Sequence, residues 1–335
     1  AGLYISVPFC RSKCSYCNFA SDVFSRTIFQ GYVERICADL HQAQTLAAEV
    51  GGCLENQVDS IYLGGGTPTL LDITGLERLF VTISQNFHLT ANAEITVECA
   101  PGTLNDSMIA VLMRCGVNRV SLGVQSFVDQ EARSVGRLHT RAVVLDDITR
   151  LRGAGISNIN VDLIAGLPHQ SMASWLTSIE DAIHSDAPHV SIYMLEVDED
   201  SRLGRELIAG GTKYHAHFVP DEDLTADLYE AACERLHSAG IEQYEISNFA
   251  KAGKWSLHNL KYWLRKPYLG LGVDAHSMLF ARDANLRAVR FSMPDSVDGY
   301  MRGSHQEKTA GSATAFLQEA FFLGLRLNQG VDIQE

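Results

Sequence analysis

The sequence predicts an α/β fold in which parallel strands alternate with helices. Runs such as Ile61–Gly65 are almost continuously apolar, which is typical of parallel strands covered on both faces. Helical segments between them end in a glycine followed by a new strand, as at Gly116. Six runs carry the strand pattern: Leu3–Phe9, Ser60–Gly64, Ala93–Cys99, Arg119–Val124, Asn158–Ile164 and His189–Leu195.

The strands and the helices between them have the periodicities of elements with one buried face. In the first strand, Leu3, Ile5 and Val7 alternate onto a single face. In the segment Asp106–Cys115, apolar residues recur at helical spacing. Repeated strand–helix units imply parallel strands joined by right-handed crossovers. On these patterns alone, an open partial barrel and a doubly wound sheet are both open alternatives.

The pattern changes after about Asp198. Residues 198–211 are polar and carry glycines, so we expect loops there, followed by a helix over residues 221–239. An aromatic-rich segment covers residues 244–268. Residues 314–327 predict an apolar helix that needs a partner to bury it.

Length and charge limit the organisation and the function. The 335 residues, 46% of them hydrophobic, are enough for a large α/β domain and a smaller one. We predict a core over residues 1–220 and a C-terminal α+β or helical extension over residues 221–335, which we expect to be truncated. A net charge of −13 argues against non-specific nucleic-acid binding. No apolar run approaches the roughly 18 residues that span a bilayer.

Three of the eight cysteines, Cys10, Cys14 and Cys17, directly follow the first predicted strand. Eight are too few for a disulfide scaffold and suit a reducing compartment, so we expect a cytoplasmic location. A closed zinc site needs a fourth ligand, and the next candidates, Cys37 and His41, lie on a predicted helix. Three thiolates can instead hold an iron–sulfur cubane with one iron free. The spacing favours a [4Fe–4S] cluster, with a zinc loop or three unrelated thiols as alternatives.

Polar residues lie at the same end of the following strands. Gly64–Pro68 (GGGTP) follows the second strand, Glu98 and Gln125 end the third and fourth, and Asp162 lies in the fifth. A buried carboxylate is costly unless it has a partner, which favours ligand contacts for Glu98 and Asp162. Arg137 carries a planar fork that suits a carboxylate. For each residue alone, a turn, capping or surface role is an equal alternative.

The motif from Cys10 to Cys17 (CRSKCSYC) resembles the CxxxCxxC signature of the radical S-adenosylmethionine (radical SAM) superfamily. The resemblance implies a partial (β/α)6 TIM-like barrel, with a [4Fe–4S] cluster on the three cysteines and S-adenosylmethionine at its open iron. Together the motifs resemble the coproporphyrinogen III oxidase-like group of that superfamily. By that resemblance, the residues that contact S-adenosylmethionine are Tyr4, Tyr16, Gly65, Gly66, Thr67, Glu98, Gln125, Arg137 and Asp162, with Tyr16 packed on the adenine.

Two features bear on the branch within that group. Where the oxygen-independent oxidase carries a fourth cysteine, CxxxCxxCxC, this chain has Phe19. The run His258–Trp263 (HNLKYW) resembles the HNxxYW motif of the HemW heme chaperones, which bind heme and deliver it to respiratory proteins. An imidazole can ligate heme iron beside flat aromatic rings, so His258 is the predicted ligand and His276 a second candidate. The alternative for His258 is a buried histidine held by hydrogen bonds.

We therefore predict a heme chaperone that holds a [4Fe–4S] cluster, S-adenosylmethionine and heme, and delivers heme to respiratory-chain proteins. Cleavage of S-adenosylmethionine is expected to be slow or absent. A homodimer and peripheral contact with a membrane are compatible with the sequence. The alternative is an oxygen-independent oxidase that decarboxylates coproporphyrinogen III through a substrate radical. A third hypothesis is a zinc-stabilised interaction protein.

Overall fold

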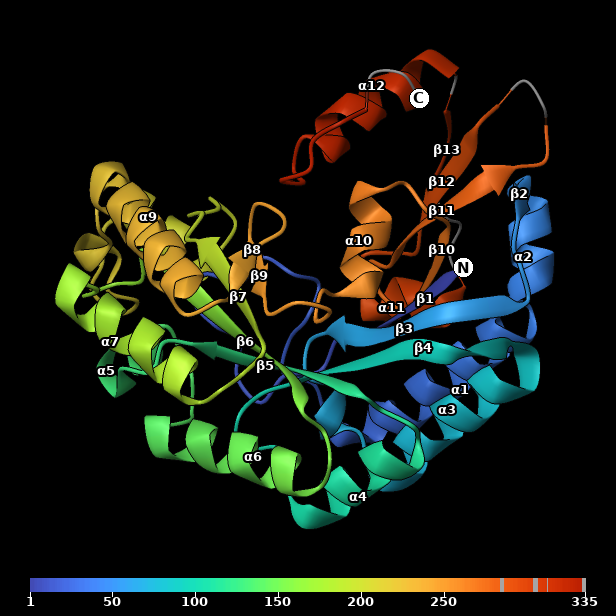
Figure 1. The fold of residues 1–335 in the computed structure, drawn as a ribbon. Coiled ribbons are helices and arrows are strands. Elements are labelled where there is room, and N and C mark those ends of the chain that lie inside the picture. The colour runs from blue at the N-terminus through green and yellow to red at the C-terminus, as the bar shows by residue number, and fades with distance from the viewer. Residues whose placement is uncertain (284–285, 304–306, 312, 333–335) are drawn as a thin grey trace.

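The computed structural model describes residues 1–283, 286–303, 307–311 and 313–332 (Figure 1). Six parallel strands form the middle of one sheet and are paired in the order in which they occur along the chain. A doubly wound sheet reverses its strand order, so this sequential order supports the partial barrel instead. These strands are β1 (Gly2–Val7), β3 (Gln57–Gly65), β4 (His88–Cys99), β5 (Arg119–Gln125), β6 (Asn158–Ala165) and β7 (His189–Met194).

Helices line the outer face of the parallel strands (Figure 1). They are α1 (Phe29–His41), α3 (Ile73–Asn86), α4 (Asp106–Arg114), α6 (Arg141–Gly153), α7 (Met172–His184) and α9 (Glu222–Ser238). The side chain of Asn105 caps α4 by accepting a hydrogen bond from the Met108 amide at 2.8 Å. Gly116 follows with φ +77°, a conformation that glycine adopts without steric cost, and turns the chain into β5.

The alternation of side chains along each strand separates the core from the site. Leu3, Ile5 and Val7 are fully buried in the main apolar core. Tyr4 and Ser6 point to the opposite side of β1, where they line a cavity. The strands that follow bury polar side chains, namely Ser60, Thr96, Ser121, Asn160 and Ser191. One side of the sheet is therefore apolar, while the other supplies hydrogen-bonding groups.

The residues after 220 extend both edges of the same sheet. Next to β1 lies β10 (Tyr268–Leu271), which is parallel to it, and then the antiparallel strands β11 (His276–Ala281), β12 (Ala288–Ser292) and β13 (Glu307–Gly311). Next to β7 lie β9 (Asn248–Ala250) and β8 (Glu242–Gln243). In the described part of the chain, the end strands β13 and β8 are not paired with each other. Two domains divided at residue 220 stay a prediction.

One expectation for the connecting segments is wrong. Residues 198–211 contain the helix α8 (Arg202–Ala209), because Ser201 caps it by accepting a hydrogen bond from Gly204 at 2.9 Å. The apolar helix expected near the end is confirmed as α12 (Ala313–Gly324). The remaining elements are α2 (Ala43–Glu49), β2 (Gly52–Cys53), α5 (Asp129–Ser134), α10 (Leu257–Trp263), α11 (Val297–Arg302) and the 3-10 turns Arg26–Ile28, Pro68–Leu70 and Ala216–Phe218. Within the described ranges, no helix is long and apolar enough to cross a bilayer.

Candidate functional site

The loop after β1, over residues 8–22, carries the three clustered cysteines, and we call it the cluster loop. Its two ends are held together, since the Cys10 amide donates to the Asp22 carbonyl and the Asp22 amide to the Pro8 carbonyl, both at 3.0 Å. Inside the loop, the Lys13 ammonium donates to the Ser21 carbonyl at 2.8 Å. The chain therefore closes on itself around the cysteines, as a loop that wraps a bound group must.

The thiols differ in burial. Cys14 is buried, whereas Cys10 and Cys17 are half-buried, and all three are free. Burial raises the pKa of the Cys10 and Cys17 thiols. In the described residues, no three cysteine, histidine or acidic side chains are close enough together to hold a single metal ion. A cubane takes its thiolates at separate irons, so the ligands of such a cluster need not meet at one metal ion.

A cavity of about 560 Å³ opens beside this loop, at the carboxyl ends of the parallel strands. We call it the cysteine-lined cavity. Ligand sites of α/β folds occur at this edge of the sheet, and the volume is within the usual range for small-molecule sites. Its walls include Cys10, Cys14 and Cys17, together with eight of the nine predicted S-adenosylmethionine residues: Tyr16, Gly65, Gly66, Thr67, Glu98, Gln125, Arg137 and Asp162.

Glu98 ends β4 and has two hydrogen-bond partners. It accepts from the Tyr62 hydroxyl at 2.8 Å and from the Gly65 amide at 3.1 Å. Burial raises the pKa of Glu98 to about 7 despite these donors. The Tyr62 contact is absent from the sequence prediction. The sequence held a signal for this contact, because Tyr62 and Gly64 are two residues apart and therefore lie on the same face of β3.

Asp162 lines the same cavity and also has hydrogen-bond partners. Its carboxylate accepts from the Ser121 hydroxyl at 3.0 Å and from the Asn160 amide at 2.7 Å. Asn160 continues the network to the Ser191 hydroxyl at 3.0 Å. Burial raises the pKa of Asp162 as well. The two half-buried carboxylates are therefore both hydrogen-bonded and line the cavity, where a positively charged ligand would favour their ionised forms.

The glycines after β3 allow close packing of the cluster loop. A side chain at Gly66 would lie 2.7 Å from the Phe9 carbonyl oxygen, and Gly65 has φ +96°. The amides of Gly65, Gly66 and Thr67 already donate to Glu98, Val7 and Phe9. At these three positions, the groups that can still contact a ligand are therefore the carbonyl oxygens and the Thr67 hydroxyl. These oxygens can accept hydrogen bonds from an amino group of the ligand.

Arg137 reaches the cluster loop from the segment after α5. One nitrogen, Nη1, donates to the Cys14 sulfur at 3.5 Å, and Nη2 donates to the Gly123 carbonyl. A side chain at position 123 would lie 2.9 Å from Nη2, so glycine is required for this approach. Gln125 follows at the end of β5 with φ +68°, where the pairing with β6 shifts by one residue. The irregular pairing of β5 with β6 thus occurs at a residue that lines the cysteine-lined cavity.

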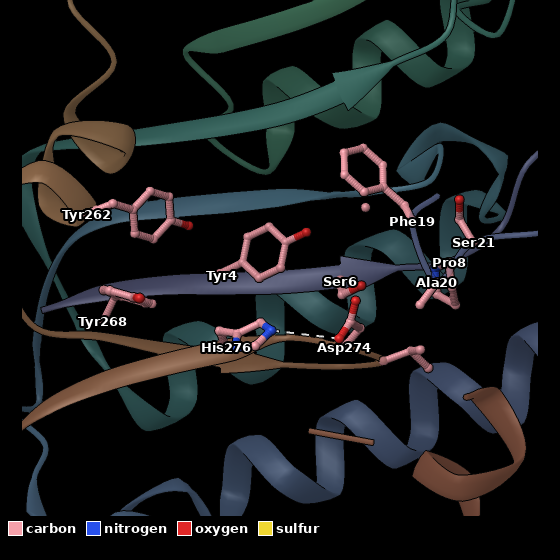
Figure 2. A pocket seen from close by; sticks show the side chains of 12 residues that line it. Tyr4, Ser6, Pro8, Phe19, Ala20, Ser21, Tyr262, Tyr268, Asp274 and His276 are labelled. Carbon is pink, nitrogen blue, oxygen red and sulfur yellow. Dashed lines mark ion pairs between the residues drawn. The ribbon is translucent and has the colours of Figure 1, made fainter. Parts of the chain in front are cut away.

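Tyr4 lies in a second cavity, of about 310 Å³, rather than in the first (Figure 2). We call this the tyrosine-lined cavity, and its wall also includes Ser6, Tyr262, Tyr268, Asp274 and His276. Both cavities share Phe19, Ser21 and Gly65. The two spaces are therefore neighbours, divided by the end of the cluster loop.

His258 is fully buried and lines neither cavity. Its Nδ1 is hydrogen-bonded to the Ser60 hydroxyl at 2.9 Å, and its Nε2 to the Tyr262 hydroxyl at 3.0 Å. Burial lowers the pKa of His258 to about 3, so the ring is neutral at physiological pH. Ligation of heme iron by His258 stays a prediction, and it would require one of these hydrogen bonds to open.

Comparison with known proteins identifies the class to which the fold and the cavity belong. The pattern of the radical SAM superfamily matches residues 4–182, and the chain belongs to that superfamily. Its relatives include the heme chaperones HemW of Lactococcus lactis, 33% identical over 99% of this chain and 83% of the relative, and of Escherichia coli, 33% identical over 91% and 76%. Both resemblances seen in the sequence, to the superfamily and to the HemW branch, are thereby confirmed.

A solved structure supports the fold. The structure of coproporphyrinogen III oxidase (HemN) from Escherichia coli superposes with a TM-score of 0.81 over 98% of this chain and 75% of that chain. The sequence identity is 21%, so this likeness concerns the fold alone. It confirms the predicted α/β architecture with a parallel, TIM-like sheet.

Proposed function

We propose that this protein is a heme chaperone that holds a [4Fe–4S] cluster and S-adenosylmethionine in the cysteine-lined cavity and passes heme to respiratory-chain proteins. The observation that carries the cofactor part is the convergence of Cys10, Cys14 and Cys17 with eight predicted cofactor residues on one cavity. The heme part is supported by relatives named heme chaperone HemW that match nearly the whole chain.

In this proposal, Cys10, Cys14 and Cys17 hold the cluster, and Arg137 offsets part of their negative charge through its contact with Cys14. When bound, the cluster supplies an open iron for the amino and carboxylate groups of S-adenosylmethionine and an electron for its cleavage. Tyr16 packs against the small cluster of Val135, Ile164 and Leu167 at the cavity wall, where an adenine ring would find an apolar surface.

The remaining polar groups of the cavity bind the charged parts of S-adenosylmethionine. The carboxylates of Glu98 and Asp162 favour the positively charged amino and sulfonium groups, because opposite charges attract strongly in a partly buried site. Arg137 and Gln125 supply donors for the methionine carboxylate. Tyr4 lines the neighbouring cavity. Its link to the other predicted S-adenosylmethionine residues is Gly65, which borders both cavities.

Phe19 favours the chaperone over the oxidase. The oxidase pattern has a thiol at that position, whereas here an apolar ring, 65% exposed, lines both cavities. An oxygen-independent coproporphyrinogen III oxidase is the alternative function. The eight free cysteines suit a reducing compartment and support the proposed cytoplasmic location. Dimerisation and transfer to a respiratory acceptor are part of the proposal.

One anaerobic experiment separates the two functions. Reconstituted protein is incubated with coproporphyrinogen III, S-adenosylmethionine and a reductant, and in parallel is titrated with hemin. The chaperone predicts a stable complex with hemin and no protoporphyrinogen. Formation of protoporphyrinogen at many turnovers would establish the oxidase instead. Absence of both activities in protein with a full cluster would contradict both functions.

A further inference from the structure

The tyrosine-lined cavity has at its mouth an imidazole that the proposed function does not yet use. We propose that this cavity binds the heme, with His276 as the axial ligand of its iron. This inference rests on the proposed heme binding and names the site for it.

His276 is available for ligation. It begins β11, its side chain is 69% exposed, and no hydrogen bond to either ring nitrogen is found among the described residues. The contrast with His258 is direct, because both ring nitrogens of that buried histidine are engaged by Ser60 and Tyr262. A neutral imidazole with a free nitrogen is what an iron ligand requires.

Asp274 lies beside this imidazole at ion-pair distance, beyond the length of a hydrogen bond, and is the acceptor that we assign to the second ring N–H. Its Oδ1 lies 3.7 Å from His276 Nε2, and Figure 2 shows the two groups facing each other. Metal-ligating histidines commonly donate their second ring N–H to a carboxylate, which fixes the ring and makes it more basic. The turn that carries Asp274 is itself fixed, since its amide donates to the Pro294 carbonyl at 2.8 Å and its φ is +56°.

Aromatic rings from separate segments form the wall next to His276. Tyr4 comes from β1, Phe19 from the cluster loop, and Tyr262 and Tyr268 from α10 and β10. The rings of Tyr262 and Tyr268 meet edge to face with centroids 4.7 Å apart. Such a wall offers flat apolar contact to a macrocycle. Because the imidazole is at the mouth, a macrocycle lying over the cavity would reach it without complete burial.

This arrangement gives the HNxxYW motif a different part in heme binding. His258 Nε2 is bonded to the Tyr262 hydroxyl at 3.0 Å, so the buried histidine fixes the tyrosine ring that lines the cavity. His258 is then a positioning residue, and Tyr262 makes the contact. An exposed axial ligand also suits transfer, because an acceptor can approach heme that is only partly enclosed.

Titration of the full chain with hemin, followed by the Soret band, tests the assignment. Loss of a residue that hydrogen-bonds to a metal ligand typically weakens metal binding roughly 10–100-fold. Asp274→Asn is expected to weaken hemin affinity by about the lower value of that range. His276→Ala is expected to weaken it at least as much as this range and to shift the Soret band. His237→Ala is the matched control, since that histidine is also exposed but lies on α9. Iron-free protoporphyrin should bind to His276→Ala and to the unaltered protein with equal affinity, because it needs no axial ligand. It should bind more weakly to Phe19→Ala.

The outcomes are distinct. Wild-type affinity and spectrum in His276→Ala, with hemin still bound by the unaltered protein, would overturn the assignment and leave heme binding intact. A loss confined to His258→Gln would return the ligand to that residue. Equal losses in His276→Ala and His237→Ala would mean adventitious surface binding only. Failure of the unaltered protein to bind hemin would overturn the proposed function itself.

Discussion

The guanidinium of Arg137 donates a hydrogen bond to the sulfur of Cys14 across 3.5 Å, although 123 positions separate the two residues in the chain. The same side chain donates to the Gly123 carbonyl, so its fork is held between the cluster loop and the end of β5. A fixed cation at this point can offset thiolate charge and meet a carboxylate with planar geometry. Arg137 thus joins the proposed cluster site to the proposed S-adenosylmethionine site.

Arg137→Lys should weaken S-adenosylmethionine binding while leaving the fold intact. A lysine keeps the charge but loses the fork, and hydrogen bonds to charged groups contribute about 1.5–3 kcal/mol, which corresponds to about tenfold or more in affinity. Calorimetry on anaerobically reconstituted protein measures this change. Arg133→Lys, at an exposed position of α5, is the control and should bind normally. Equal affinity in both variants would contradict the role of Arg137.

Serine at Cys10, Cys14 or Cys17 should abolish the cluster. Each substitution removes one of the three thiolates that would hold the cubane. Iron and sulfide are counted after anaerobic reconstitution, where the unaltered protein should hold about four of each. Cys53→Ser is the control, because that cysteine is exposed on β2. Zinc in place of iron after anaerobic purification would refute the cluster.

Glu98→Gln should change how stability depends on pH. The pKa of Glu98 is raised from 4.5 to about 7, so the folded protein keeps a proton that the unfolded chain loses in this window. Stability therefore falls as pH rises from about 4.5 to 7, and the glutamine variant lacks this loss because its amide does not titrate. Without cofactor at pH 8, the variant should be more stable by about 1–3 kcal/mol, with the difference vanishing near pH 4.5.

Urea unfolding at several pH values measures the Glu98 effect. Glu49→Gln, at an exposed position of α2, is the control and should follow the unaltered protein. A constant difference between Glu98→Gln and the unaltered protein from pH 4.5 to 8 would show that the pKa of Glu98 is not raised in the folded protein.

His258→Gln should have the opposite pH dependence. Burial lowers the pKa of His258 from 6.5 to about 3, so the unfolded chain binds the extra proton and the protein loses stability as pH falls through this range. At pH 7 the variant should be less stable by about 1–3 kcal/mol, because the hydrogen bonds to Ser60 and Tyr262 are disturbed. At pH 5 this deficit should shrink by about 1–2 kcal/mol.

Chemical denaturation at pH 7 and pH 5 checks the His258 prediction. His88→Gln, at an exposed position of β4, is the matched control. A deficit for His258→Gln that grows on acidification would mean that the imidazole is charged in the folded protein, and hence that its surroundings differ from those described.

The strands were predictable because each carries its own signal. β1 alternates in Leu3, Ile5 and Val7, and buried runs such as β3 are largely apolar, so no knowledge of neighbours is needed. The helix α8 was missed because its start depends on one capping serine, Ser201, in an otherwise polar segment. A polar segment of that length can form either a loop or a short helix, and its packing against the rest of the chain decides between them.

The site residues at strand ends were predictable for a geometric reason. Parallel strands bring their carboxyl ends to one edge, so Glu98, Gln125 and Asp162 had to lie near the cysteines once the sheet was recognised. Tyr4 was the exception, because it lines the neighbouring cavity together with Tyr268 of β10 and His276 of β11. Distance from the strand end did not signal this difference, because Asp162 lies as far from the end of β6 as Tyr4 lies from the end of β1.

The sequence by itself determined the clustered cysteines, the repeated strand–helix units and the family, because these depend on residues close together in the chain. Only the tertiary structure decided what the histidines can do. His258 became buried when α10 packed against β3, where Ser60 engages Nδ1, while Tyr262 on the same helix engages Nε2. The turn into β11 left the imidazole of His276 exposed. Burial is set by contacts between distant segments, so the spacing of Cys10, Cys14 and Cys17 suffices to predict a cluster, whereas the choice between His258 and His276 as the proposed heme ligand depends on the fold.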